Sequence, residues 1–174
     1  MTLLARAAFV AALAFLLRPE LARYAAERRL RDATDRFRAV LAHPGKQEEV
    51  RAALDRIAEL ASAAAADLPG DPRPRVLAAS ARLVSGRTRE ALDLYRDALA
   101  AGERAEIDLN LGRAHALAGN APEAQVALRR ALWISPALSA ALPNPIAKKL
   151  LDDVARLENE LRAGLLREPP GLPD

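Results

Sequence analysis

The chain has 174 residues, enough for one ordinary domain with some additional length, and 51% of it is hydrophobic while only 3% is aromatic. Alanine and leucine supply most of the hydrophobic residues and favour close-packed helices over sheet, and the absence of cysteine excludes disulfides and thiolate metal sites. The net charge of +3 is concentrated near the N-terminus, because residues 1–40 carry eight Arg against four acidic residues while residues 41–144 hold 13 basic and 13 acidic residues.

The first predicted element is an apolar segment, Leu3–Leu17, interrupted only by Arg6. We interpret residues 1–18 as an uncleaved single-pass membrane anchor, although the apolar segment Leu3–Leu17 rises only about 22 Å as a helix against the ~30 Å of a hydrocarbon core. A cleaved signal peptide and a buried core helix are the alternatives. No small-x-small cleavage site follows, since Arg18-Pro19-Glu20 comes directly after the apolar residues.

Arginines follow this segment closely. Arg18, Arg23, Arg28 and Arg29 lie within a few turns of its end. The positive-inside rule then predicts that the main domain lies in the cytoplasm, and the periplasm is the alternative. The anchored protein is expected in the inner (cytoplasmic) membrane of a bacterium. The same arginines predict attraction to anionic lipid at the membrane surface.

Residues 19–70 predict a hairpin of two long helices. Pro19 suits the first turn of a new helix, which should run to Ala42, and a second helix should extend from Lys46 to about Asp67. Two prolines in the segment 68–72 end it.

A near-repeat with an offset of 33 residues follows, between residues 72–103 and 105–136. Small residues recur at the matching positions where two helices must touch: Ala79 and Gly112, Gly86 and Gly119, Ala91 and Ala124, Ala98 and Ala131. Each half therefore predicts a helix pair, with Gly86 and Gly119 at the turn in the left-handed conformation that ends a helix.

Residues 71–136 resemble two tetratricopeptide repeats (TPR). The second half matches most of the family's spacing, at Leu111, Gly112, Ala124, Leu128, Ala131 and Pro136. Residues 19–70 resemble a degenerate repeat. The resemblance implies an all-α, TPR-like solenoid of helical hairpins whose curved surface holds another polypeptide.

A C-terminal capping helix is predicted within residues 137–166, opening at Asn144-Pro145. Its apolar positions are spaced by four and three residues: Ile146, Leu150, Val154, Leu157, Leu161 and Leu165. One side of this helix should close the core while the other faces water. The proline-rich tail, residues 167–174, is expected to be disordered.

The partner-binding groove implied by the resemblance lies on the first helix of each repeat. It comprises Arg73, Val76, Ser80, Leu83, Glu106, Leu109, Asn110, Arg113 and Leu117. Such a mixed apolar groove suits an amphipathic helix. Trp133 on the last repeat helix is either covered by the segment that follows it or exposed as a binding hot spot.

Catalytic, cofactor and metal sites are not predicted. His43 falls in a turn, and His115 occupies the position where the family usually has Tyr, so both are interpreted as structural. The carboxylates of the last helix alternate with basic residues and predict a solvated face with ion pairs one turn apart.

These features predict a membrane-anchored TPR scaffold, assembly factor or accessory subunit that binds another protein of a membrane complex. The first alternative is a basic helical-repeat protein that binds nucleic acid, which the neutral balance of residues 41–144 disfavours. An enzyme is the more distant alternative.

Overall fold

The computed structural model describes residues 3–43, 45–168 and 171. These residues form helices and no strand, so the prediction of an all-α fold is confirmed. The helices are α1 (Leu3–Ala42), α2 (Gln47–Asp67), α3 (Pro72–Val84), α4 (Thr88–Ala101), α5 (Ala105–Leu117), α6 (Ala121–Ile134), the 3₁₀ helix η1 (Pro136–Ala141) and α7 (Asn144–Arg162).

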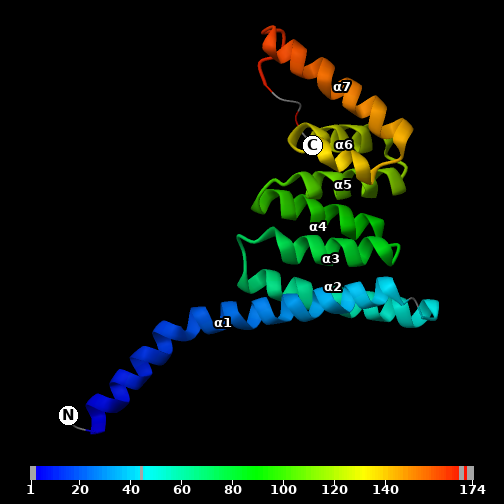
Figure 1. The fold of residues 1–174 in the computed structure, drawn as a ribbon. Helices are drawn as coiled ribbons and strands as arrows, with labels where there is room; N and C mark the ends of the chain where they lie inside the picture. The colour runs from blue at the N-terminus through cyan, green and yellow to red at the C-terminus, as the bar shows by residue number, and fades with distance from the viewer. Residues whose placement is uncertain (1–2, 44, 169–170, 172–174) are drawn as a thin grey trace.

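The apolar segment and the helix predicted after it form one continuous helix, α1. A new helix does not begin at Pro19, which lies inside α1. Helix-forming residues on both sides continue the helix, and a proline then costs one backbone hydrogen bond and bends the helix without ending it. Figure 1 shows such a bend, with the N-terminal part of α1 projecting from the rest of the protein.

The predicted membrane anchor within residues 1–18 is wrong. No helix formed by the described residues is long and apolar enough to cross a membrane, and the single-pass inner-membrane localisation is corrected with it. The physical reason is visible in the sequence, since the apolar segment contains Arg6 and is followed at once by Arg18 and Glu20. Residues 1 and 2 lie outside the described part of the chain.

Each helix from α1 to α6 packs on the next one in the chain, and the connections between them are short. Short connections make consecutive helices antiparallel neighbours, which stack in the order of the sequence (Figure 1). Their contact surfaces are rich in alanine, and Ala33, Ala61, Ala81, Ala91 and Ala131 have no exposed surface. These small side chains let the helix backbones approach closely.

The stack has an inner and an outer row of helices. In the inner row α1 contacts α3, α3 contacts α5, and α5 contacts η1. Among the described residues, α2, α4 and α6 make no comparable contacts with one another. The stack is therefore tighter along α1, α3, α5 and η1, and this row forms its inner side.

The two turn glycines predicted from the near-repeat adopt the expected conformation. Gly86 has φ 83° and Gly119 has φ 79°, and each lies two residues after the end of an inner-row helix, directly after its C-cap residue. The predicted close contact at Gly112 is also present. A Cβ at this position would lie 2.6 Å from Leu128 Cγ on the paired helix α6, so only glycine fits without displacement.

The C-terminal helix α7 begins at Asn144, one residue before the predicted start at Pro145, and ends at Arg162. Asn144 is therefore the first helical residue and not the predicted N-cap, which is Pro143. Gly164, with φ 72°, reverses the backbone there, and the N–H of Leu165 donates to the carbonyl of Glu160. One side of α7 buries Leu150 and Val154 against α6. The tail begins beyond this point, and residues 169–170 and 172–174 of it lie outside the described residues.

Candidate partner-binding surface

The predicted groove residues of the first repeat lie on α3, in the inner row. Val76, Ser80 and Leu83 are partly exposed, whereas Arg73 is exposed. Helix α3 begins where it does because the Asp71 carboxylate accepts a hydrogen bond from the backbone N–H of Arg73 at 2.9 Å, which satisfies a donor that the helix leaves free.

The predicted groove residues of the second repeat lie on α5, but they do not share one environment. Glu106, Arg113 and Leu117 are exposed and Asn110 is partly exposed. Leu109 is only 4% exposed, because it packs in the cluster that α5 forms with α6 and α7. The structure therefore brings all of these residues except Leu109 to the surface.

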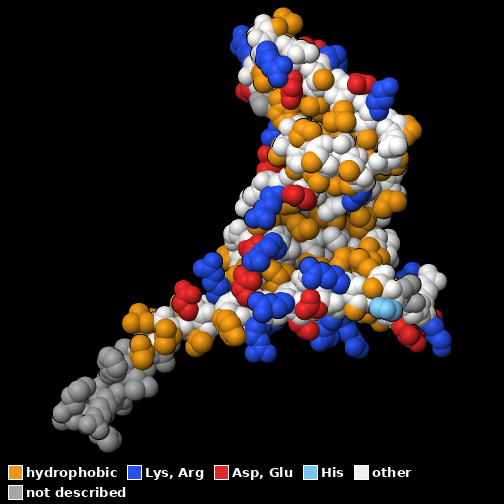
Figure 2. Space-filling view, viewed as in Figure 1, with side chains coloured by type: hydrophobic (Ala, Val, Ile, Leu, Met, Phe, Trp, Pro, Cys, Tyr) orange, Lys and Arg blue, Asp and Glu red, His pale blue; other side chains and the backbone are white. Residues whose placement is uncertain are grey.

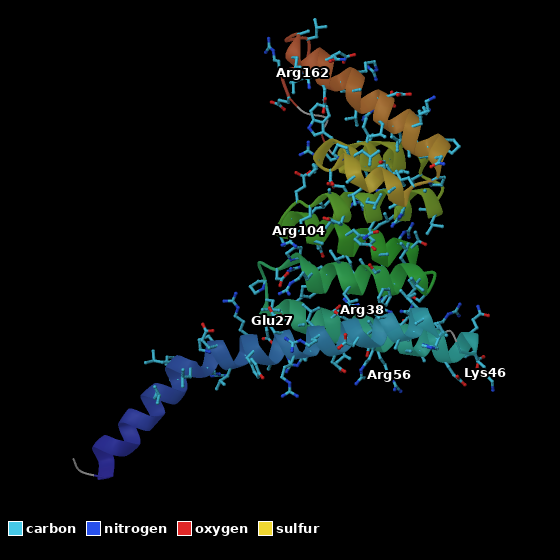
Figure 3. All side chains as sticks on the ribbon, viewed as in Figure 1. Glu27, Arg38, Lys46, Arg56, Arg104 and Arg162 are labelled. Atoms are coloured by element: carbon cyan, nitrogen blue, oxygen red, sulfur yellow. The ribbon has the colours of Figure 1, made fainter. Side chains whose placement is uncertain are left out.

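Arg73 is held by two carboxylates. Its guanidinium pairs with Glu27 of α1 at 2.7 Å and with Asp71 at the start of its own helix. Figure 3 labels Glu27 on α1 beside the lower end of the stack. Arg73 thus links α1 to α3, and its charge is largely neutralised within the protein.

A polar cluster joins α3, α4, α5 and η1 further along the inner row. The hydroxyls of Ser80 and Tyr95 lie 3.0 Å apart in a hydrogen bond, and Arg113 donates to the carbonyl of Ala141 at 2.7 Å and to Asn110 at 3.3 Å. Burial raises the pKa of the Tyr95 hydroxyl, while the bond to Ser80 and the charge of Arg113 act in the opposite direction. This cluster fixes Arg113 in one orientation.

Two exposed apolar side chains stand at equivalent positions of the two repeats. Val84 at the end of α3 is 51% exposed, and Leu117 at the end of α5, 33 residues later, is 70% exposed. Neither belongs to a buried cluster among the described residues. Because α3 and α5 are in contact, these two side chains lie at the same end of neighbouring inner-row helices, one turn beyond Ser80 and Arg113 of the polar cluster. We call this pair the apolar edge.

Trp133 is partly buried. Its side chain packs against the cluster of α5, α6 and α7, together with Leu138 and Leu142 from the segment that follows it and Leu151 of α7. This is the covered arrangement of the two that the sequence allowed, and it makes Trp133 a packing residue of the C-terminal end.

The four arginines predicted to face a membrane surface, Arg18, Arg23, Arg28 and Arg29, are all exposed on α1. Arg29 pairs with Asp67 at the end of α2 at 3.0 Å. The other three make no ion pair with a carboxylate of the described residues.

Asp108 is a buried acidic residue that the sequence analysis did not single out. It has no exposed surface, and neither carboxylate oxygen has a hydrogen-bond partner among the described residues. The pKa of Asp108 is raised to about 7, mainly by burial and also by the charge of Glu103, while Arg130 opposes the shift. Glu103 and Arg130 form an ion pair at 2.6 Å. The one sequence signal was an acid directly between two apolar residues, Ile107 and Leu109.

The two histidines differ in environment. His43 is exposed at the end of α1, while His115 is 2% exposed. Its Nδ1 lies 3.4 Å from Asn120 Nδ2, and burial lowers the pKa of His115, with a smaller lowering by Arg96 and an opposing effect of Glu123. His115 is therefore neutral near pH 7. Within the described residues no group of three or more metal-ligating side chains comes together.

Comparison of the chain with protein-family models, curated proteins and solved structures found no match.

Proposed function

We propose that this protein is a TPR-like helical-repeat scaffold that binds another polypeptide along its inner row of helices. The observation that carries the proposal is the apolar edge of Val84 and Leu117, repeated at the same position of two stacked hairpins beside an ordered polar cluster. Repeated surfaces of this kind suit an extended partner that contacts successive repeats. The 33-residue near-repeat supports the same conclusion.

The partner expected from this surface is an amphipathic helix. An apolar edge next to fixed hydrogen-bonding groups offers one strip for apolar side chains and one for polar side chains, which is how a helix binds in a groove. Arg113 is held by Asn110 and Ala141, and it meets the partner without a further loss of side-chain freedom.

The structure also decides which substitutions test the proposal. Charge reversal at Arg73 or Arg113 would break contacts that hold the fold, so loss of binding in those variants would not be informative. Val84 and Leu117 are exposed, so Val84→Glu should leave the fold intact and position 117 can carry a probe. The matched control is Ala52→Glu, at an exposed apolar position of the outer row.

The experiment is site-specific photo-crosslinking in cells, with the photoreactive residue at position 117 or at position 100. We expect one discrete polypeptide to be crosslinked from position 117 and not from position 100. Crosslinking from position 117 should be lost when Val84→Glu is added but retained when the control Ala52→Glu is added. Equal crosslinking from both positions, or none from position 117, would contradict the proposed binding surface.

A further inference from the structure

The N-terminal part of α1 is the largest unpartnered apolar element of the described chain. We define this arm as residues 13–24 of α1. Its exposed apolar side chains are Leu13 (45%), Phe15 (74%), Leu16 (69%), Leu17 (46%), Leu21 (63%) and Tyr24 (66%). Among the α1 side chains that the structure describes, from Leu13 onward, the first that is buried against the other helices is Ala26. The arm therefore takes no part in the intramolecular core, and it projects from the stack (Figure 1).

The apolar surface of the arm changes along the helix. Near its beginning, Leu13, Phe15 and Leu16 point to different sides, because successive residues are about 100° apart around a helix. From Leu17 onward the exposed apolar residues, Leu17, Leu21 and Tyr24, are spaced by four and three and share one side. The exposed apolar side chains therefore lie on several sides of the helix at Leu13–Leu16 and on one side from Leu17 to Tyr24.

The same side of α1 then becomes cationic. Arg28 and Arg31 continue the spacing of four and three after Tyr24, and both are exposed. The acids beside them are already paired, Asp32 with Arg36 at 3.0 Å and Asp35 with Arg38 at 3.5 Å. No carboxylate of the described residues pairs with Arg28 or Arg31. Figure 2 shows apolar side chains on the described part of the arm, with basic side chains where α1 joins the stack.

We propose that this side of α1 docks on an anionic lipid surface, with the exposed apolar side chains of the arm below the headgroups and Arg28 and Arg31 at the phosphates. A lipid surface accommodates apolar side chains over a wide arc of a helix, as at Leu13, Phe15 and Leu16, whereas one partner helix covers a single stripe. Tyr24 stands at the transition between the apolar and cationic parts, where an aromatic residue with a polar end is favoured at a membrane interface. Residues 13–31 hold five Arg and two Glu, which complements an anionic surface.

Lengths along the helix agree with this arrangement. The rise from Leu13 to Tyr24 is about 16 Å and the rise from Tyr24 to Arg31 is about 10 Å. Helix α1 continues for ten residues before Leu13, so the arm lies along the lipid surface. Arg28 and Arg31 then reach the same surface within two turns of Tyr24.

The test is flotation of the full chain with preformed vesicles of phosphatidylcholine, with or without phosphatidylserine. We expect binding to the phosphatidylserine vesicles that weakens as salt is raised. Arg28→Gln with Arg31→Gln should weaken this binding about 30-fold, at roughly fivefold per arginine. The control, Arg51→Gln with Arg56→Gln, removes two exposed arginines of α2 and should leave it unchanged.

Phe15→Ser with Leu16→Ser should abolish vesicle binding while circular dichroism of the folded stack is retained. The proposal is overturned if the wild-type chain does not float with phosphatidylserine vesicles, or if the α2 control weakens binding as much as the α1 variant. A dimer in light scattering would also overturn the proposal if Phe15→Ser with Leu16→Ser dissociates it and if added vesicles do not. A second copy of the chain, and not lipid, would then cover the arm.

Discussion

The buried carboxyl of Asp108 provides the most quantitative prediction. Its pKa is raised to about 7 from an ordinary 3.8, so the folded protein binds this proton more tightly than the unfolded chain does. Between pH 4 and pH 7 the folded state therefore retains a proton that the unfolded state has lost, and stability falls as the pH rises. Above pH 7 the full cost of a buried charge is present. A shift of this size corresponds to about 4 kcal/mol, at roughly 1.4 kcal/mol per pH unit.

Asp108→Asn keeps the size of the side chain and removes its charge. Near pH 4 the variant and the wild type should be about equally stable, because the wild-type carboxyl is then neutral too. The variant should gain stability relative to the wild type as the pH rises, by about 4 kcal/mol at pH 8. Urea denaturation followed by circular dichroism at several pH values between 4 and 8 measures this difference.

An exposed carboxylate on a neighbouring helix serves as the control. Asp97→Asn replaces an exposed carboxylate of α4 in the same way and should change stability by less than about 0.5 kcal/mol at every pH. If the difference between Asp108→Asn and wild type is the same at pH 5 and pH 8, or if the variant is less stable at pH 8, the reasoning about Asp108 is refuted.

Three further substitutions test the packing and the turns through their urea midpoints. Gly112→Ala should lower the free energy of unfolding by about 1–3 kcal/mol, because the new Cβ meets Leu128. Gly70→Ala should leave it nearly unchanged, because a Cβ there meets nothing within 4 Å. Equal urea midpoints for the two variants would contradict the close contact of α5 and α6. Gly119→Ala should lower the free energy of unfolding by about 1–2 kcal/mol, because φ is 79° and alanine is strained in this left-handed conformation. An unchanged urea midpoint would argue against the left-handed turn. Trp133→Ala should lower the free energy of unfolding by about 2 kcal/mol, because it removes a half-buried ring from the contact of α6 with α7. If the variant is as stable as the wild type, the ring is in solvent.

Much of the local structure could be predicted because its causes are local. The near-repeat placed the turns at Gly86 and Gly119, since a helix that must end in a left-handed residue favours glycine. The start of α7 was predicted to within one residue on the same kind of evidence. The ion pairs of α7 were also expected from spacing, and Arg156 pairs with Glu160 at 2.9 Å. Side chains one turn apart on a helix are neighbours whatever the rest of the fold does.

The N-terminal segment was predicted less well. Its apolar composition was read as a membrane anchor, and Pro19 as the start of a second helix, but α1 is continuous and no described helix is able to span a membrane. A proline favours a helix start and is also tolerated inside a long helix at the cost of a bend. The local sequence does not distinguish these outcomes, because the packing of the following residues on α2 contributes to the stability of the whole helix.

By itself, the sequence determined that the chain is all-helical, where most helices begin and end, and that two hairpins repeat with an offset of 33 residues. Only the tertiary structure decided which side chains of the inner-row helices remain at the surface. Val76 is partly exposed at the margin of the cluster of α3, α4 and α5, while the equivalent Leu109 is buried in a cluster with Leu128, Leu150 and Val154. Tertiary structure likewise buried Asp108 beside the Glu103–Arg130 pair. Helical periodicity is a property of neighbouring residues, whereas burial depends on which distant segments pack against them.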